Sequence, residues 1–111
     1  MRSVRVPVSG WAHSVLEPCC ELEWKEDPEI EAVCAAYRAG KGQALVVSID
    51  NAKLVRDGLV MLSDIEDEMA DRRNTHPETR RMARWSSDGL SGLYIRLCRA
   101  VDALRKAVSG G

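Results

Sequence analysis

The sequence has no phenylalanine and few aromatic residues of any kind. Aromatic residues make up 5% of the 111 positions, and they comprise three tryptophans and two tyrosines. The core must therefore be built from aliphatic side chains and methionine, which suits helices. Hydrophobic residues account for 45% of the chain and charged residues for 30%. This composition is typical of a folded globular protein and excludes a wholly disordered chain or a collagen-like repeat.

Long apolar runs are also missing. No stretch approaches the roughly 18 uninterrupted apolar residues that a membrane-spanning helix requires. The first ten residues alternate polar and apolar side chains and lack the continuous apolar block of a secretion signal. We therefore expect a cytoplasmic protein, in a bacterial cell or a phage-infected host, with no membrane contact.

The chain has almost no excess charge, because its formal net charge is −1. This balance excludes the simplest kind of nucleic-acid-binding protein, one whose whole surface is basic. Catalytic motifs are absent as well. There is no Gly-x-Ser-x-Gly element, and Gly40-Lys41-Gly42 lacks the length and the Ser or Thr of a phosphate-binding loop. The sequence favours a non-enzymatic protein without a cofactor.

The four cysteines and two histidines suggest one alternative, a small thiol-dependent or metal-dependent protein. Its nearest set of ligands is His13, Cys19, Cys20 and Cys34. Structural zinc sites, however, separate paired cysteines by two to four residues, so that both sulfurs point inward. Adjacent cysteines in a strand point to opposite faces. We therefore interpret these cysteines, and Cys98, mainly as small packing residues.

The first 49 residues predict short elements. Residues 3–6 and 20–24 alternate polar and apolar side chains as strands do, and the segment between them, which includes Pro18, looks like turns. Asp27-Pro28 predicts the start of a helix, and Gly40 is placed to close that helix in the left-handed conformation. Residues 44–49 form a β-branched run that predicts a buried strand.

Two long amphipathic helices are predicted in residues 50–109. The first begins at a cap provided by Ser48 or Asp50 and extends to residue 73. The second begins at a capping box formed by Thr75 and Glu78. Its glycines at positions 89 and 92 predict a bend or a close contact within residues 86–92. Residues 109–111 are expected to fray.

The short connector between the long helices predicts an antiparallel hairpin. The expected architecture is therefore an α+β fold, with a long antiparallel helical hairpin, a short helix and a small two- or three-stranded sheet. We expect a single domain over residues 1–111, in which residues 1–49 hold the strands and first helix, 50–109 the hairpin and 110–111 a tail.

Acidic residues at the end of the first long helix are expected to pair with arginines that begin the second. The residues in this predicted pairing are Asp64, Glu66, Asp67, Glu68 and Asp71 with Arg80, Arg81 and Arg84.

The last helix is longer than the helix it pairs with, so part of its apolar stripe is not buried by that helix. This part comprises Leu97, Val101, Leu104 and Val108. It predicts either packing under the N-terminal strands or a self-association seam, and hence a homodimer. Gly58 and Gly92 would allow close backbone approach at such a crossing.

Charge is strongly segregated along the chain. Residues 17–31 carry seven acidic residues and one lysine, whereas residues 72–106 carry nine basic residues and three acidic ones. Such segregation is typical of a protein that associates with a charged partner, although the two halves could also neutralise each other. The candidate acidic surface for a protein partner comprises Glu21, Glu23, Glu26, Glu29, Glu66, Asp67 and Glu68.

These patterns lead to the hypothesis of a small protein-interaction protein. One specific version is a phage or mobile-element inhibitor, similar in role to an anti-CRISPR protein. In this version the carboxylates replace phosphates and cover the nucleic-acid-binding surface of a host defence complex. The alternative from the same charge pattern is a direct nucleic-acid-binding or regulatory protein that uses Arg80, Arg81 and Arg84.

Overall fold

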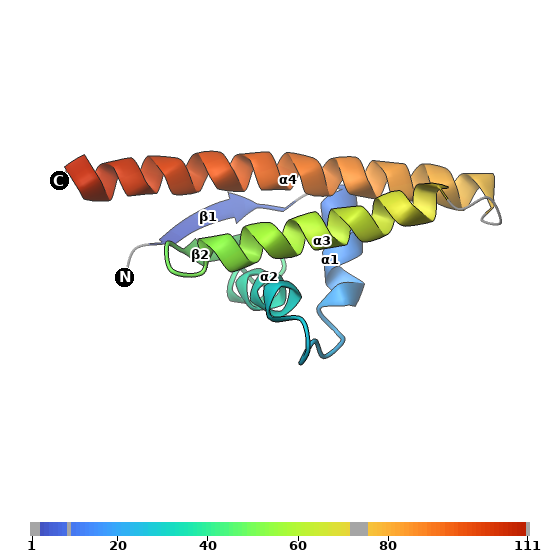
Figure 1. Cartoon of the computed structure of the whole chain (residues 1–111), viewed down its shortest axis with the longest axis horizontal. Helices are drawn as coiled ribbons and strands as arrows, with labels where there is room; N and C mark the ends of the chain where they lie inside the picture. The colour runs from blue at the N-terminus through green and yellow to red at the C-terminus, as the bar shows by residue number, and fades with distance from the viewer. Residues whose placement is uncertain (1–2, 9, 72–75, 111) are drawn as a thin grey trace.

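The computed structural model describes residues 3–8, 10–71 and 76–110. The elements, in chain order, are β1 (Ser3–Pro7), α1 (Trp11–Cys19), α2 (Pro28–Ala39), β2 (Ala44–Ser48), α3 (Ala52–Asp71) and α4 (Pro77–Gly110). Helices α3 and α4 lie side by side and run antiparallel (Figure 1). The predicted α+β fold with a long helical hairpin is confirmed, and within the described residues its sheet has two strands.

Helix α4 sets the shape of the molecule. It contains 34 residues, which at about 1.5 Å per residue gives a rod of roughly 50 Å. The longest dimension of the chain is 54 Å and the other two are 25 and 21 Å. All other elements therefore lie along one side of a single helix, as Figure 1 shows.

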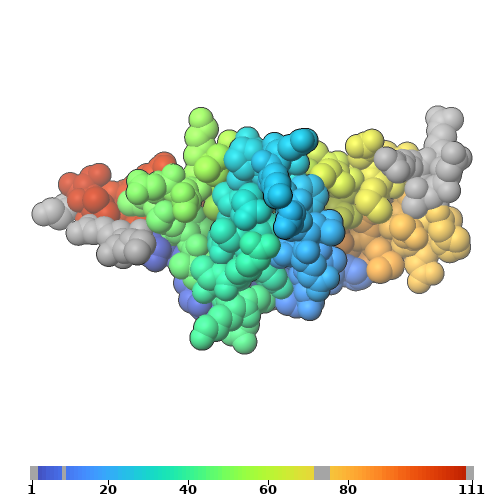
Figure 2. Space-filling view, turned by 90° about the horizontal axis from the view of Figure 1, so that it is seen from below, coloured from blue at the N-terminus to red at the C-terminus, as the bar shows by residue number. Residues whose placement is uncertain are grey.

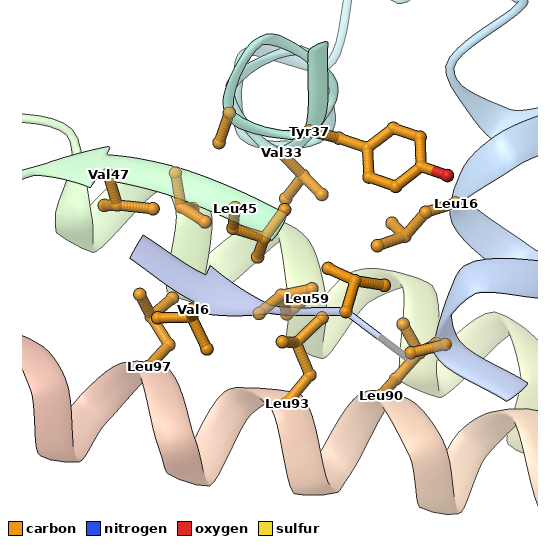
Figure 3. Packing of buried hydrophobic residues seen from close by; sticks show 14 of the residues in the cluster. Val6, Leu16, Val33, Tyr37, Leu45, Val47, Leu59, Leu90, Leu93 and Leu97 are labelled. Carbon is orange, nitrogen blue, oxygen red and sulfur yellow. The ribbon is translucent and has the colours of Figure 1, made fainter. Parts of the chain in front are cut away.

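The two strands pair antiparallel, with Val6 opposite Leu45 and Val4 opposite Val47. Strand β1 lies against α4, and β2 lies on the side that faces α2 (Figure 3). Because paired residues share a face, Val4, Val6, Leu45 and Val47 lie on the same face of the sheet, and this face is turned to the core. On the opposite face, Ser3, Arg5 and Pro7 of β1 are exposed.

One side of α4 provides the centre of the core. Leu90, Leu93, Leu97 and Val101 follow the spacing of three and four residues, and all four are almost fully buried. Figure 3 shows Leu97 beside Val6 of β1 and Leu93 close to Leu59 of α3. Packing under the N-terminal strand is therefore confirmed for Leu97 and Val101, and these two residues do not form an exposed self-association seam. Leu104 is half-buried, and Val108 is exposed.

Two glycines permit close approach between helices. A Cβ atom on Gly58 would collide with the carbonyl oxygen of Glu29 and the side chain of Val33, so α3 crosses α2 at this point. A Cβ on Gly89 would lie 2.8 Å from the backbone nitrogen of Ala12, so α1 sits directly on α4. The expected close contact in residues 86–92 is confirmed, but the alternative of a bend is wrong because α4 is unbroken. Gly92 faces open space and takes no part in a crossing.

Helix α1 corrects the prediction of a turn-like segment. Ala12, Val15, Leu16 and Cys19 have the spacing i, i+3, i+4 and i+7 of a helix with one apolar face, and Ala12 and Leu16 are buried. Pro18 signals a turn in the sequence, but it lies in the last turn of α1, and the helix ends one residue later because proline cannot donate to the carbonyl of Ser14.

The predicted strand at residues 20–24 is wrong. Its backbone forms turns instead, in which the Glu21 and Leu22 nitrogens donate to the carbonyls of Pro18 and Cys19. The indole nitrogen of Trp24 also donates to the Cys19 carbonyl, over 2.9 Å. Alternation over five residues predicted a strand, but these local hydrogen bonds to the end of α1 determine the conformation.

Several predicted helix ends also need correction. Gly40 does not adopt the left-handed conformation, since its φ is −88°. Lys41 and Gly42 adopt it instead, with φ of 57° and 76°.

The Ser48 side chain does accept a hydrogen bond from the Asn51 nitrogen before α3, as expected of a cap. Residue 110 is helical rather than frayed. The capping box at Thr75 and the end of the first long helix at residue 73 lie outside the described residues.

The buried stripe of α4 leads to a stability prediction. Replacing Leu93 with alanine should lower the free energy of unfolding by about 2–5 kcal/mol, because it removes a fully buried side chain and leaves a cavity. Ile95 is on the same helix but is 49% exposed, so Ile95→Ala should cost less than about 1 kcal/mol. Urea unfolding of both variants measures the difference. Equal losses would contradict the packing described here.

Candidate protein-binding groove

An apolar groove of about 510 Å³ opens between α1, the end of α3 and the start of α4. Apolar side chains dominate its walls. Those on α1 and the following turn are Trp11, Val15, Pro18, Cys19, Leu22 and Trp24, and those on the hairpin are Leu62, Ile65, Met69, Met82 and Ala83. In Figure 2, α1 (blue), the end of α3 (yellow) and the start of α4 (orange) lie in the same part of the molecule, and α1 contacts α4.

The groove exposes more apolar surface than isolated side chains would. Leu22 is 58% exposed, and Ile65 and Met82 are also exposed, although all three lie among apolar neighbours. Trp11 at the groove packs against Trp85, with ring centroids 5.2 Å apart and a tilt of 39°. Contiguous apolar surface of this kind is typical of an interaction site in a folded protein.

The hairpin itself creates this exposure. Ile65 and Met69 continue the same stripe of α3 that buries Val55, Leu59 and Leu62. Along α4, Met82 and Trp85 precede the buried residues in the same way. The sheet and α2 cover the middle of the hairpin, whereas near its connector end the helix that packs on α4 is α1, which contains nine residues. The apolar faces of α3 and α4 therefore extend beyond the core and form part of the walls of the groove.

Glu66 is the one charged side chain among the described residues that line the groove. Burial raises the pKa of its carboxyl group above the ordinary value. Within residues 3–8, 10–71 and 76–110, Glu66 takes part in no ion pair and no side-chain hydrogen bond. A partly desolvated carboxylate in an apolar wall would gain from a cationic group brought by a partner.

The other residues of the predicted acidic surface lie in two places. Glu21, Glu23 and Glu26 are exposed on the turn between α1 and α2. Leu22 and Trp24 in this turn line both the groove and a neighbouring hollow that Glu23 also lines, so this part of the acidic surface borders the groove. Glu29 is half-buried at the start of α2, where its carbonyl meets Gly58.

Asp67 and Glu68 follow Glu66 on α3 but do not line the groove. Asp67 accepts a hydrogen bond of 2.5 Å from the hydroxyl of Ser87, and Ser87 is 3.1 Å from the hydroxyl of Ser63. This network joins α3 to α4 at a partly buried point of the hairpin. One carboxylate oxygen of Asp67 is therefore engaged within the fold, while the residue itself is exposed, and its assignment to the partner surface stays a prediction.

The predicted charge pairing across the hairpin is wrong for Asp64, Glu66, Asp67 and Asp71, because none of them forms an ion pair with Arg80, Arg81 or Arg84 in the part of the chain that the structure describes. Within residues 3–8, 10–71 and 76–110 the ion pairs are His13 with Glu17, Lys25 with Glu23, and Arg38 with Glu31. None of them joins α3 to α4. The hairpin is held by apolar packing and by the serine–aspartate network. The arginines expected in that pairing, Arg80, Arg81 and Arg84, instead line a separate hollow of about 270 Å³ with Pro77.

The residues of the metal hypothesis do not come together as one set. The Nδ1 atom of His13 is 2.8 Å from the hydroxyl of Tyr37, and its Nε2 atom is 3.2 Å from the carboxylate of Glu17. Cys19, Cys20 and Cys34 lie together at the junction of α1 and α2. In the part of the chain that the structure describes, no group of three or more His, Cys, Asp or Glu side chains is arranged to hold a metal ion.

No family model, curated protein or solved structure matches the chain. None of the helices in the described residues combines the length and the apolar character needed to cross a membrane. The interpretation of the groove therefore depends on its own geometry and chemistry.

The raised pKa of Glu66 leads to a prediction about stability and pH. A carboxyl group with a higher pKa in the folded state than in the unfolded state loses stabilising free energy as pH rises through that interval. Replacing Glu66 with glutamine removes this loss. The stability of Glu66→Gln relative to the natural chain should therefore increase from below pH 4.5, the ordinary value, to neutral pH.

Urea unfolding at a series of pH values tests this prediction. Glu26→Gln is the control, because it removes the same charge from an exposed position that does not line the groove. A constant stability difference between Glu66→Gln and the natural chain over this pH range would contradict the burial of Glu66.

Proposed function

We propose that this protein is a small interaction protein that binds a basic, amphipathic helical segment of another protein in the groove between α1, α3 and α4. The observation that carries the proposal is the combination of an open apolar groove with the desolvated carboxylate of Glu66 in its wall. Helix-in-groove recognition uses such a combination, in which apolar anchors fill the groove and charges set the orientation.

Charge complementarity supports the choice of a basic partner. The turn that borders the groove carries Glu21, Glu23 and Glu26, all exposed. An approaching basic segment would be attracted to this surface before its apolar residues entered the groove. An acidic segment would be repelled and would bring a like charge next to the half-buried Glu66.

Basic amphipathic segments are common in proteins that bind nucleic acid. The inhibitor hypothesis stays a prediction within this proposal: an acidic protein that covers such a segment would block its access to nucleic acid. The homodimer also stays a prediction. If it forms, Leu97 and Val101 do not mediate it, because both are buried within the chain.

The groove can be tested with designed peptides. The probe is a fluorescein-labelled helix of about four turns, with leucines at i, i+3, i+4 and i+7 and lysines on the flanks. One control peptide has the same composition in scrambled order, and another has the same leucines with glutamates in place of lysines. Fluorescence anisotropy should show that the basic amphipathic peptide binds tightest.

Variants of α3 locate the binding site. Ile65 and Val60 are both 44% exposed, but only Ile65 lines the groove. Ile65→Asp should weaken binding of the basic peptide by about tenfold or more, because it places a charge where an apolar anchor is expected. Val60→Asp should leave binding unchanged. Glu66→Lys should reduce the preference for the lysine peptide over the glutamate peptide.

Three results would overturn the proposal. The first is equal affinity for all three peptides, and the second is equal effects of Ile65→Asp and Val60→Asp. The third is a dimer, seen by analytical ultracentrifugation, that Ile65→Asp dissociates, because the groove would then hold a second copy of the chain. Salt-dependent binding of duplex DNA that is lost on replacing Arg80, Arg81 and Arg84 with glutamate, without peptide binding, would favour the nucleic-acid alternative.

A further inference from the structure

Three cysteines that are far apart in the sequence meet where α1 ends against α2. Cys19 is the last residue of α1, Cys20 follows it, and Cys34 lies in the middle of α2. Cys34 is fully buried in the core, whereas Cys19 and Cys20 are half-buried and pack against it. All three are free thiols.

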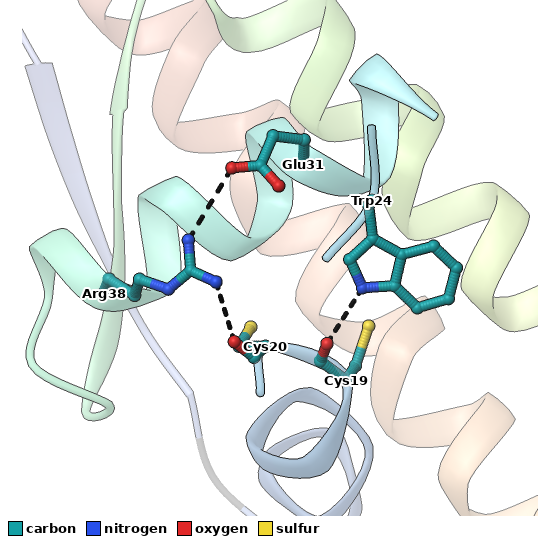
Figure 4. A network of polar contacts seen from close by, with 5 residues as sticks. All are labelled: Cys19, Cys20, Trp24, Glu31 and Arg38. Atoms are coloured by element: carbon teal, nitrogen blue, oxygen red, sulfur yellow. Dashed lines mark hydrogen bonds and ion pairs between the residues drawn. The ribbon is translucent and has the colours of Figure 1, made fainter. Parts of the chain in front are cut away.

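The backbone around these thiols is held in place by two side chains. The guanidinium group of Arg38 donates to the Cys20 carbonyl over 2.7 Å, and it also lies 3.7 Å from the carboxylate of Glu31. The indole of Trp24 donates to the Cys19 carbonyl. Figure 4 shows these contacts on either side of the cysteine pair. Arg38 lies one turn after Cys34 on α2, so the same helix face carries both the buried thiol and the cation.

The three thiol groups affect one another's ionisation. Hydrogen bonding with the thiols of Cys19 and Cys20, aided by Arg38, lowers the pKa of Cys34 despite its burial. Hydrogen bonding with Cys34, together with burial, raises the pKa of Cys19 and of Cys20. Of the three groups, Cys34 therefore loses its proton most readily.

We propose that Cys19, Cys20 and Cys34 form a redox-active site, in which Cys34 makes a reversible disulfide bond with Cys19 or Cys20 when a low-molecular-weight disulfide such as oxidised glutathione is present. The half-buried thiols and the buried thiol have separate tasks. A half-buried thiol can meet the oxidant, whereas Cys34 is enclosed by the core and can react only with its neighbours.

The reaction takes two exchange steps. First, Cys19 or Cys20 loses its proton to water and its sulfur attacks the glutathione disulfide, which forms a mixed disulfide and releases one glutathione thiolate. Cys34 then loses its proton to water, and its sulfur attacks the protein sulfur of the mixed disulfide and expels the second glutathione as a thiolate. Two protein thiols are oxidised, and one glutathione disulfide is reduced to two glutathione molecules after protonation.

The test uses the full chain in mixtures of reduced and oxidised glutathione. Remaining thiols are alkylated, and mass spectrometry of the intact chain and of its peptides identifies the bonds. In the natural chain, we expect the peptide with Cys34 to become cross-linked to the peptide with Cys19 and Cys20, within one monomer. Excess reduced glutathione should reverse this bond. Cys98→Ser is the matched control and should form the bond equally well.

Two further variants keep the outcome unambiguous. Cys34→Ala should lose the bond, and circular dichroism checks that this buried position still permits folding. Cys19→Ser/Cys20→Ser, altered at half-buried positions, should lose it too. The proposal is overturned if the natural chain keeps all its thiols or forms only mixed disulfides. It is also overturned if Cys34→Ala loses a pair of thiols as readily as the natural chain, because the bond would then join Cys19 to Cys20.

Discussion

The burial of one side of α4 is the interaction on which the rest of the structure depends. Leu90, Leu93, Leu97 and Val101 are enclosed by elements that have little cover of their own. A two-stranded sheet is marginal in water, and α1 is too short to be stable alone. Each becomes stable because it packs on this helix. The positions of α1, β1 and α3 therefore follow from where α4 runs, and α2 and β2 are placed through α3 and β1.

Segments with a long, regular pattern were predicted correctly. The hairpin, the strand at Ala44–Ser48 and the helix that begins at Pro28 follow from apolar spacing and from proline at a helix start. Short segments were harder to predict. Residues 11–19 carry the apolar spacing of a helix, but Pro18 suggested a turn. Residues 20–24 alternate like a strand, but hydrogen bonds to the end of α1 hold them in turns.

The candidate site was only partly predictable, for the same reason. The acidic turn could be identified from charge alone, and Glu66 belonged to the predicted surface. The groove needs α1 as its third wall. It could not be predicted as long as residues 11–19 were expected to form a turn. Periodicity also does not separate Ile65 and Met82 from the buried residues of the same stripes, because exposure depends on which elements reach each end of the hairpin.

Cys19 belongs to two parts of the molecule at once, because it lines the apolar groove and also affects the ionisation of Cys34. A covalent link from this residue to α2 would tether the last turn of α1 and restrict the movement of one wall. The groove would then be preorganised, and an incoming helix would lose less conformational entropy on binding. Affinity at the groove and the redox poise of the surroundings would thereby be thermodynamically linked through one side chain.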